Sequence, residues 1–265
     1  MDLDVFLRIA FFMFGTMIGS FLNVCIVRWP LEKSVVFPGS HCPSCKAPLH
    51  WYDNIPVFSY IALQGKCRQC KAGINIRYMG VELLTGCVFL ATLWHWGLSW
   101  VLVPYLIMFC GFIVATFVDF EHRIIPDEVS IGGMIVGLVL SPLIPQIHGT
   151  SIWWQALLQS GIGVLVGGGS IYLMGVIGEW IFKKEAMGGG DVKLMAMIGA
   201  FMGWKLALLT FFLAPFMGAI IGIIEKIRTK DSAIAYGPYL VAGAVISLVW
   251  GEQLLHWWLA TFAGI

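Results

Sequence analysis

Long apolar runs, separated by short polar segments, make up most of this chain. A helix needs about 20 mostly apolar residues to cross a bilayer, because each residue advances it by about 1.5 Å. Seven runs have a suitable length, at residues 5–27, 79–97, 100–119, 129–147, 153–182, 206–225 and 237–260, and a shorter one covers 192–204. The pattern therefore predicts an all-α polytopic membrane protein with about eight transmembrane helices.

The composition supports a chain that is surrounded by lipid. Of its 265 residues 59% are apolar and 12% are charged, and the net charge is +1. A soluble domain carries about 25% charged residues. These values exclude a disordered chain and an ordinary cytosolic enzyme, and they give no basic face for nucleic acid. We expect the lipid bilayer as a partner and no nucleic acid.

The basic residues predict how the chain is oriented. If the short run 192–204 also crosses the membrane, 14 of the 16 lysines and arginines fall on one side. The other side then keeps only Arg8 and Lys205. Basic loops stay in the cytosol, so the loop 28–78, with seven lysines and arginines, is expected there. Leaving out the short run would break this partition, and we therefore count it as a span.

The loop after the first apolar run contains two CxxC pairs. Cys42 and Cys45 form the first pair, Cys67 and Cys70 the second, and 21 residues separate the pairs. Two such pairs are typical of a tetrahedral zinc site, although this separation is slightly longer than usual. Closing the site on a metal would fold a segment that is too short to build its own core. We expect three regions: a first helix at 1–28, a cytosolic zinc module at 29–78, and a membrane domain at 79–265.

Other uses of these cysteines are less consistent with the sequence. Disulfides are the main alternative, but a cytosolic loop is kept reduced. A catalytic zinc needs an open coordination position, and four thiolates would already fill the coordination sphere even though His41 and His50 are near in sequence. The expected role of the metal is structural.

Two carboxylates at the ends of apolar runs are candidates for chemistry. Asp119 ends the third run, and Asp191 opens the short run after three consecutive glycines. Ionisable groups at such places are costly and are functional candidates by default. Both are expected at the cytosolic edge of the membrane, from separate helices that could face one another. The alternatives are a solvated edge residue for Asp119 and a simple flexible turn for the glycines.

The residues around the two aspartates suggest supporting roles. Gly188 and Gly190 would let the chain turn sharply and approach another backbone closely. Lys193 is expected to support the charge of Asp191. Glu121 lies two residues after Asp119 and therefore on another face of the helix. Asp127, just before the next apolar run, is expected to be an N-cap.

A converging pair of aspartates would favour one chemistry. Two adjacent carboxyl groups do not both ionise easily, so they share one proton. The ionised partner can take a proton from water while the protonated partner polarises a peptide carbonyl. The sequence contains neither a serine nucleophile elbow nor an HExxH zinc motif, which lowers the rival protease classes.

Several segments together resemble a known family. They are "GSFLNVCIVRWP" at 19–30, "WYDNIPVFSY" at 51–60, "RYMGVELLTG" at 77–86, "DFEHRIIPD" at 119–127, "GGGDVKLMA" at 188–196 and "YGPYLVAGA" at 236–244. With the cysteine pairs, they resemble the bacterial prepilin peptidases, the type IV leader peptidase family of GxGD-type intramembrane aspartyl proteases. Residues 188–191 match the GxGD pattern, and the resemblance extends over nearly the whole chain.

The resemblance implies an activity, a location and partners. Such enzymes lie in the bacterial inner membrane and remove the basic leader of type IV prepilins or of type II secretion pseudopilins. They cut after a glycine at the cytosolic face, and many then methylate the new N-terminus with S-adenosylmethionine. The catalytic roles carry over onto Asp119 and Asp191, and Glu121 stands where the family often has a second Asp. No residues for the methyl donor are assigned, because Gly167–Gly169 are better explained by close helix packing than by a nucleotide site.

Two other functions are alternatives. An ion-coupled transporter could use intramembrane carboxylates, but it would have internal repeats and a site at the midplane of the membrane, and it has no evident need for a zinc module. A scaffold of the pilus or secretion machinery would tolerate replacement of both aspartates. The peptidase is the main hypothesis.

Overall fold

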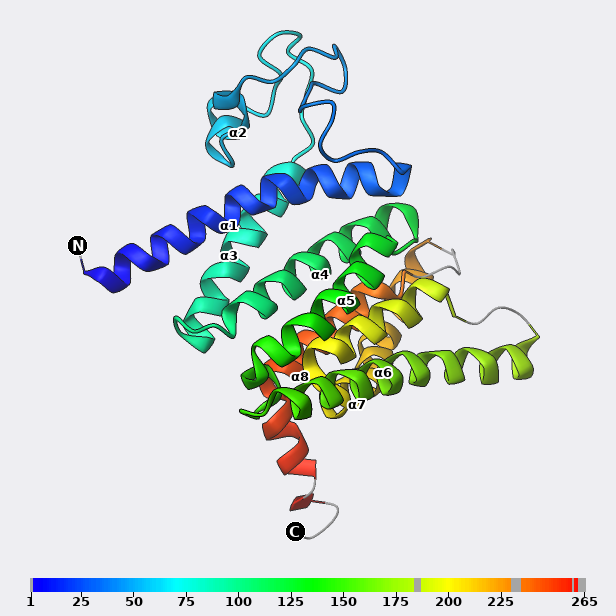
Figure 1. The fold of residues 1–265 in the computed structure, drawn as a ribbon. Helices are drawn as coiled ribbons and strands as arrows, with labels where there is room; N and C mark the ends of the chain where they lie inside the picture. Colours follow the sequence, from blue (N-terminus) through cyan, green and yellow to red (C-terminus); the bar gives the residue numbers. More distant parts are fainter. Residues whose placement is uncertain (1, 184–186, 230–234, 259, 262–265) are drawn as a thin grey trace. The chain divides into compact units, whose positions relative to one another are not determined.

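The computed structural model is mainly helical, except for the largely irregular segment 32–76 (Figure 1). It describes residues 2–183, 187–229, 235–258 and 260–261. The main helices are α1 (Leu3–Arg28), α3 (Arg77–Trp96), α4 (Leu102–His122), α5 (Asp127–Leu143), α6 (Trp153–Phe182), α7 (Gly189–Thr229) and α8 (Gly237–Trp258). Shorter ones are η1 (Trp29–Leu31), η2 (Trp51–Asn54), α2 (Phe58–Ala62) and η3 (Pro145–His148). The predicted all-α class is confirmed.

Helix lengths test the expected membrane spans in part. Within the part of the chain that the structure describes, five helices are long and apolar enough to cross a membrane, at Leu3–Leu31, Arg77–Trp96, Leu102–His122, Trp153–Ile181 and Gly189–Ala219. The total of eight spans is not confirmed by this count and stays a prediction. One local expectation was wrong: Asp127 is the first residue of α5, and the N-cap is Pro126. Proline suits a helix start, because its fixed φ and missing N–H cost nothing there.

The chain divides into two compact units, Met1–Val114 and Ala115–Ile265. The first unit contains α1, the cysteine segment and α3. Its two long helices pack through small residues, and a Cβ built at Gly19 would lie 2.8 Å from the Cα of Glu82. A Cβ at Gly86 would likewise lie 2.8 Å from Thr16. Glycine at these positions therefore allows the α1 and α3 backbones to approach closely.

In the second unit, glycines bring α6 against α7. A Cβ at Gly163 would overlap the carbonyl oxygen of Gly199, and one at Gly167 would overlap that of Met195. The interpretation of Gly167 and Gly168 as packing residues is confirmed, since a Cβ at Gly168 would lie 3.2 Å from Ala196. No atom would lie within 4 Å of a Cβ at Gly169, so this glycine has no packing role among the described residues.

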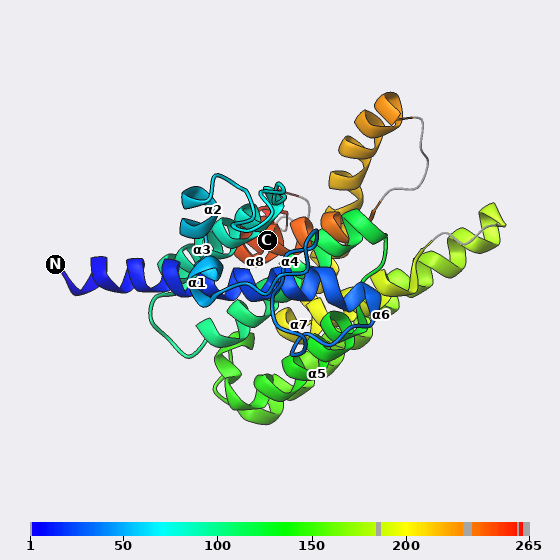
Figure 2. The same cartoon turned by 90° about the horizontal axis from the view of Figure 1, so that it is seen from above.

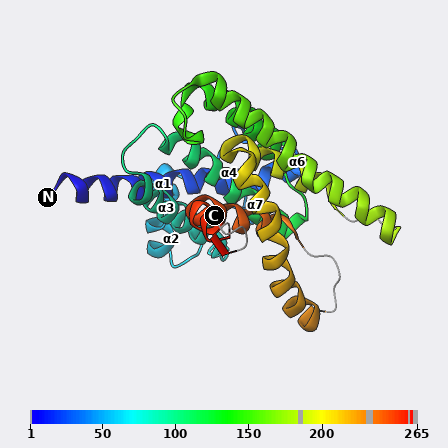
Figure 3. The ribbon, with the colours of Figure 1, turned by 90° about the horizontal axis from the view of Figure 1, so that it is seen from below.

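Helix α7 changes direction at Gly203, where φ is +74° and ψ is 173°. The position of Gly167 shows that the chain folds back, because a Cβ there would lie 3.6 Å from Ala207 as well as against Met195. In a straight helix those two residues would be separated by roughly 18 Å. Figures 2 and 3 show the later, gold part of α7 leaving the yellow part in another direction. The chain therefore breaks where the sequence separates 192–204 from 206–225.

Candidate functional site

Asp119 lies in the last turn of α4, and it is only 5% exposed. Its Oδ2 atom accepts a hydrogen bond of 2.9 Å from the backbone N–H of Gly237, the first residue of α8. The first N–H groups of a helix have no partner within the helix, and they carry its positive dipole end. A buried carboxylate is therefore stabilised by the start of another helix that follows 118 residues later in the chain.

Asp191 lies in the first turn of α7 and is half-buried. Its backbone N–H donates to the Gly188 carbonyl oxygen over 3.1 Å, which tightens the turn before the helix. A Cβ at Gly188 would lie 3.2 Å from Asp191 Oδ2, and one at Gly190 would lie 3.2 Å from the Cβ of Ile125. A Cβ at Gly189 would have no atom within 4 Å. The GxGD spacing thus has glycine at the two crowded positions, and the position between them has room for a Cβ.

The segments that carry the two aspartates lie close to one another. Ile125 lies beside both segments. Its Cβ would be 3.2 Å from a Cβ on Gly190, the residue before Asp191. Its Cδ1 would be 3.3 Å from a Cβ on Gly237, whose N–H donates to Asp119. The carboxylates of Asp119 and Asp191 are close enough to interact electrostatically. Both lie in the second unit, so the pair is built within one compact body.

Tyr236 belongs to the same site, although no sequence pattern marked it as functional. Burial, and then the charge of Asp191, raise the pKa of its phenol to about 12. Its buried hydroxyl has no hydrogen-bond partner among the residues that the structure describes. The segment "YGPYL" therefore supplies a buried hydroxyl beside one aspartate and an N–H to the other.

The expected supporting side chains are placed differently. Lys193 forms an ion pair with Asp127 at 2.7 Å, and both side chains are largely exposed. It therefore ties the start of α7 to the start of α5. Glu121 is exposed, whereas Asp119 is buried. Of the two acids in this motif, Asp119 is the one that faces the interior.

The four cysteines of the first unit come together as one cluster. The Sγ atoms of Cys42, Cys45, Cys67 and Cys70 all lie within 4.8 Å of one another, and Cys42 and Cys70 are 3.8 Å apart. Four thiolates about 2.3 Å from a tetrahedral metal would be separated by about 3.8 Å. The donor set and its spacing therefore fit a metal ion.

Both cysteine pairs have the same backbone. The N–H of Cys42 donates to Ala47, and the N–H of Cys67 donates to Ala72, over 2.9 and 2.8 Å. A lysine with positive φ follows each pair, Lys46 at +62° and Lys71 at +60°. The repeated sequence Cys-x-x-Cys-Lys-Ala thus folds twice into the same turn, which presents two sulfurs from each copy.

The segment between the pairs is fixed by a partly buried ion pair. Arg68 donates to Asp53 Oδ1 through Nε and Nη2, at 2.9 and 2.7 Å. The Asp53 side chain is only 5% exposed, and the Arg68 guanidinium also lies over the Tyr52 ring. The sequence pattern assigned no role to Asp53, and the structure shows that it binds the second cysteine pair.

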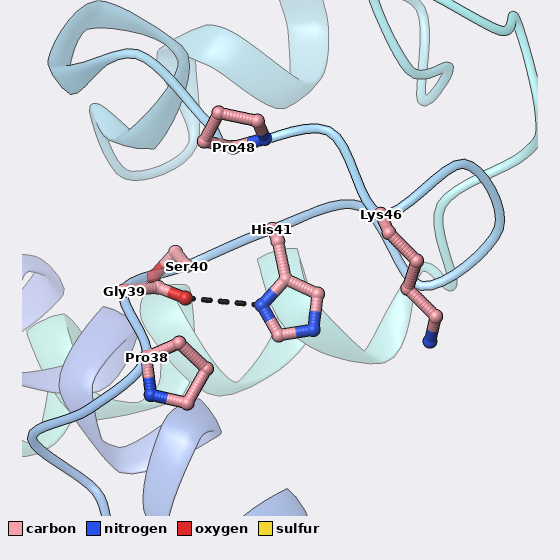
Figure 4. A pocket seen from close by; sticks show the side chains of 6 residues that line it. All are labelled: Pro38, Gly39, Ser40, His41, Lys46 and Pro48. Atoms are coloured by element: carbon pink, nitrogen blue, oxygen red, sulfur yellow. Dashed lines mark hydrogen bonds between the residues drawn. The ribbon is translucent and has the colours of Figure 1, made fainter.

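His41 is not part of the cysteine cluster. Its Nδ1 atom lies 3.0 Å from the Gly39 carbonyl oxygen, as the dashed line in Figure 4 marks. It lines a hollow of about 330 Å³ together with Pro38 and Lys46. His50 stacks on Tyr52 instead. Neither histidine belongs to the metal-binding group, as expected from the four thiolates.

These features together indicate a membrane protein with a pair of acidic side chains at helix ends and a separate cysteine cluster. The chain has several apolar helices of membrane-spanning length, a cluster of four cysteines, and two acidic side chains that converge at helix ends.

Comparison with known families assigns the chain to a family of membrane proteins. Residues 13–96 match the bacterial peptidase A24 N-terminal domain, and residues 106–223 match the type IV leader peptidase family. A Pseudomonas aeruginosa protein named prepilin leader peptidase/N-methyltransferase is 34% identical, over 94% of this chain and 92% of its own. The chain belongs to the type IV leader peptidase family.

Other relatives carry the same name. A Myxococcus xanthus protein is 39% identical over 82% of this chain, and the match covers 63% of that protein. A Neisseria gonorrhoeae protein is 31% identical over 92% of both chains. No solved structure matches the chain. The apolar helices together with the family indicate a protein of the inner membrane.

Proposed function

We propose that this protein is a membrane-embedded aspartyl endopeptidase that removes the leader of type IV prepilins or type II secretion pseudopilins and N-methylates the new terminus. The family membership and the names of the relatives support both activities. The observation that carries the peptidase assignment is the convergence of Asp119 and Asp191 at the ends of α4 and α7. No observation favours the transporter.

The chemistry divides between the two carboxylates. The hydrogen bond from Gly237 stabilises the ionised form of Asp119, so Asp119 is the group that takes a proton from the attacking water. Asp191 then holds the shared proton and donates it toward the carbonyl oxygen of the scissile bond. As the tetrahedral intermediate breaks down, the C–N bond cleaves, the leaving amine takes the proton that Asp119 had accepted, and the hydroxyl that reforms the carbonyl returns its proton to Asp191.

The four cysteines would hold one zinc ion with a structural role. Four thiolates complete its coordination sphere, so the metal would stabilise the segment 42–70 and take no part in peptide hydrolysis. The regions proposed are a first helix at 1–28, a zinc module at 29–78, and a membrane domain at 79–265.

The proposed orientation puts the site where the substrate is cut. A pilin precursor keeps its basic leader in the cytosol and its apolar helix in the bilayer. With eight spans, the loop 28–78, Asp119 and Asp191 all lie on the cytosolic side. The scissile bond, which the family places after a glycine before the apolar helix, then meets both carboxylates at the membrane edge.

Mass spectrometry of a prepilin incubated with the purified full chain tests this function. We expect leader loss with the wild type, and an additional methyl group when S-adenosylmethionine is present. Asp119→Asn and Asp191→Asn should each abolish cleavage, because either change removes half of the shared-proton pair. Glu121→Gln is the matched control and should still cleave. Normal processing by either aspartate variant would remove that residue from the mechanism.

A further inference from the structure

The first unit contains a cavity of about 600 Å³ between α1 and the cysteine segment. One wall is a face of α1 that extends from Met13 to Arg28, and the other comes from residues 35–40 and 51–56. In Figures 1 and 2 the cysteine segment lies along α1. A cavity of this volume is large enough for a nucleoside-sized ligand.

The polar groups of the cavity gather toward the C-terminal end of α1. Arg28 donates through Nη1 to the Ser34 carbonyl oxygen over 2.9 Å and through Nη2 to that of Gly39 over 3.3 Å. A guanidinium has five N–H groups in a planar fork, so Arg28 keeps donors for a ligand carboxylate. Asn54 also lines the cavity, whereas Met13 and Met17 line its apolar end.

A buried carboxyl group lies behind one wall. Glu82 of α3 is 8% exposed, and it accepts a 2.8 Å hydrogen bond from the backbone N–H of Val57. The Ser20 hydroxyl, which lines the cavity, also interacts with this carboxylate. Both of these partners are neutral hydrogen-bond donors, so neither brings a positive charge to the carboxyl group. An ionised carboxylate behind this wall attracts a cation.

Trp51 adds an aromatic surface to the opposite wall. Its side chain lines the cavity, but the residue is 80% exposed. An indole ring with free area can stack on a planar base and can also attract a cation to its face. The cavity therefore combines a planar stacking surface, an anionic wall and a carboxylate-binding guanidinium.

We propose that this cavity is the binding site of S-adenosylmethionine, an assignment that rests on the proposed methyltransferase activity. The methyl donor carries an adenine, a sulfonium cation and an amino-acid carboxylate. Trp51 stacks on the adenine, the charge of Glu82 stabilises the sulfonium, and Arg28 binds the carboxylate. An acyl chain of a lipid would need none of these three groups.

The wall of residues 38–40 is held from both sides. The Gly39 carbonyl oxygen accepts from Arg28 of α1 and lies 3.0 Å from His41 Nδ1, next to the first cysteine. Figure 4 shows this wall from its other face, where Pro38, Gly39 and Ser40 also line the smaller hollow. The proposed S-adenosylmethionine site is therefore built next to the turn that carries the first cysteine pair.

The transfer itself balances as a displacement at the methyl carbon. The lone pair of the neutral terminal amine forms the new N–C bond, and the S–C bond breaks with its electron pair remaining on sulfur. The products are S-adenosylhomocysteine and a methylated ammonium, which releases a proton to water.

Equilibrium dialysis of radiolabelled S-adenosylmethionine against the full chain in detergent tests the site. We expect Trp51→Ala and Glu82→Gln each to weaken binding about tenfold, while both variants still remove the leader. Trp94→Ala is the matched control, since Trp94 is 81% exposed in the same unit, and it should bind normally. Ultraviolet crosslinking of the labelled donor should modify peptides within 13–28 or 35–56.

Three results would overturn the assignment. Normal donor binding by both Trp51→Ala and Glu82→Gln would show that the cavity holds something else, such as a lipid chain. A crosslink outside 13–28 and 35–56 would move the site. A wild-type protein that cleaves prepilin but binds no donor would remove the methyltransferase activity itself and would leave the peptidase intact.

Discussion

Three consecutive glycines precede Asp191, and the structure separates their roles. A Cβ at Gly188 or at Gly190 would lie 3.2 Å from a neighbouring atom, whereas a Cβ at Gly189 would meet open space. The interpretation of the whole run as a flexible turn would make the three equivalent. The contacts instead make only the first and third positions specific for glycine.

Alanine substitutions test that difference. Gly190→Ala should lower the cleavage rate several-fold, because its Cβ would lie 3.2 Å from the Cβ of Ile125 and would shift the turn before Asp191 by a few tenths of an ångström. Gly189→Ala should retain the wild-type rate and gain slightly in helix stability. Rates are measured by leader loss with one prepilin. Equal rates in the two variants would contradict the assignment of the contact at Ile125.

His148 is a buried histidine that should make the stability of the protein depend on pH. Its Nε2 atom lies 2.9 Å from the Ser141 hydroxyl, and burial lowers the pKa of its ring to about 4. The unfolded chain has the ordinary pKa of about 6.5, so between these values the unfolded state binds more protons. The free energy of unfolding must therefore decrease as pH falls from about 6.5 toward 4.

Thermal unfolding in detergent at pH 7, 5.5 and 4.5 measures this effect. The wild type should lose a few kcal/mol over that range through this histidine, because each pKa unit corresponds to about 1.4 kcal/mol. His148→Gln keeps a polar group that can hydrogen-bond Ser141 but does not titrate, so its stability should depend less on pH. An identical pH dependence in both proteins would show that His148 is not buried in its neutral form.

At the scale of elements, the paired cysteine turns form one cluster whose sulfur spacing fits a metal ion. The two turns are 25 residues apart in sequence, and the Asp53–Arg68 pair links the intervening segment to the second one. Because binding of a structural metal stabilises the folded segment, loss of any one ligand should destabilise the whole segment.

Metal analysis of purified variants checks this unit. We expect one zinc ion per chain in the wild type and less than half of that in Cys42→Ser or Cys70→Ser, since three thiolates leave the coordination incomplete. Cys87→Ser is the control, because that cysteine lies on α3 outside the cluster. Full zinc occupancy in Cys70→Ser would contradict the four-cysteine site.

Close helix contact governs the pairing of α6 with α7. Gly163→Ala should destabilise the protein by about 1–3 kcal/mol, because its Cβ would meet the Gly199 carbonyl and a backbone atom cannot turn aside. Gly161→Ala should be neutral, since no atom lies within 4 Å of that position. Thermal unfolding in detergent measures both. Equal stability of the two variants would mean that these helices are not packed at Gly163.

At the scale of the whole molecule, the proposed orientation makes opposite predictions for two lysines. In intact cells a membrane-impermeant maleimide should label Lys205→Cys, whose residue lies after the short sixth span. Lys33→Cys should be labelled only after lysis, because the loop 28–78 is cytosolic by the positive-inside rule. Labelling of the wild-type protein measures the background from the native cysteines. Labelling of Lys33→Cys from outside would invert the proposed topology.

Much of the architecture could be predicted from the sequence, because lipid leaves helices as the main way to satisfy a backbone. The expected runs 79–97 and 153–182 correspond closely to α3 and α6. The cysteine spacing also predicted the cluster, since metal chemistry fixes ligand type and separation. The break at Gly203 lies two residues from the predicted one at Lys205.

The remaining features depend on partners that the sequence pattern does not specify. The donor to Asp119 is a backbone N–H of Gly237, which has no side chain to mark it. Glu82 lies within an apolar helix, and its partner is the N–H of Val57, whose φ of +64° no residue preference indicates. Asp127 was expected to be an N-cap because an apolar run follows it. The sequence does not show that the helix begins at Asp127 itself, or that Lys193 binds this residue.

The fold-back at Gly203 also limits how much of the membrane the first part of α7, which begins beside Asp191, can cover. The segment from Gly189 to Gly203 is about 21 Å long at the helical rise, whereas the hydrocarbon layer is about 30 Å thick. Such hydrophobic mismatch is relieved by thinning the bilayer or by leaving one end of the helix below its surface. In the proposed orientation, Asp191 thus works at a depth set by the surrounding lipid, and acyl chain length becomes a determinant of turnover.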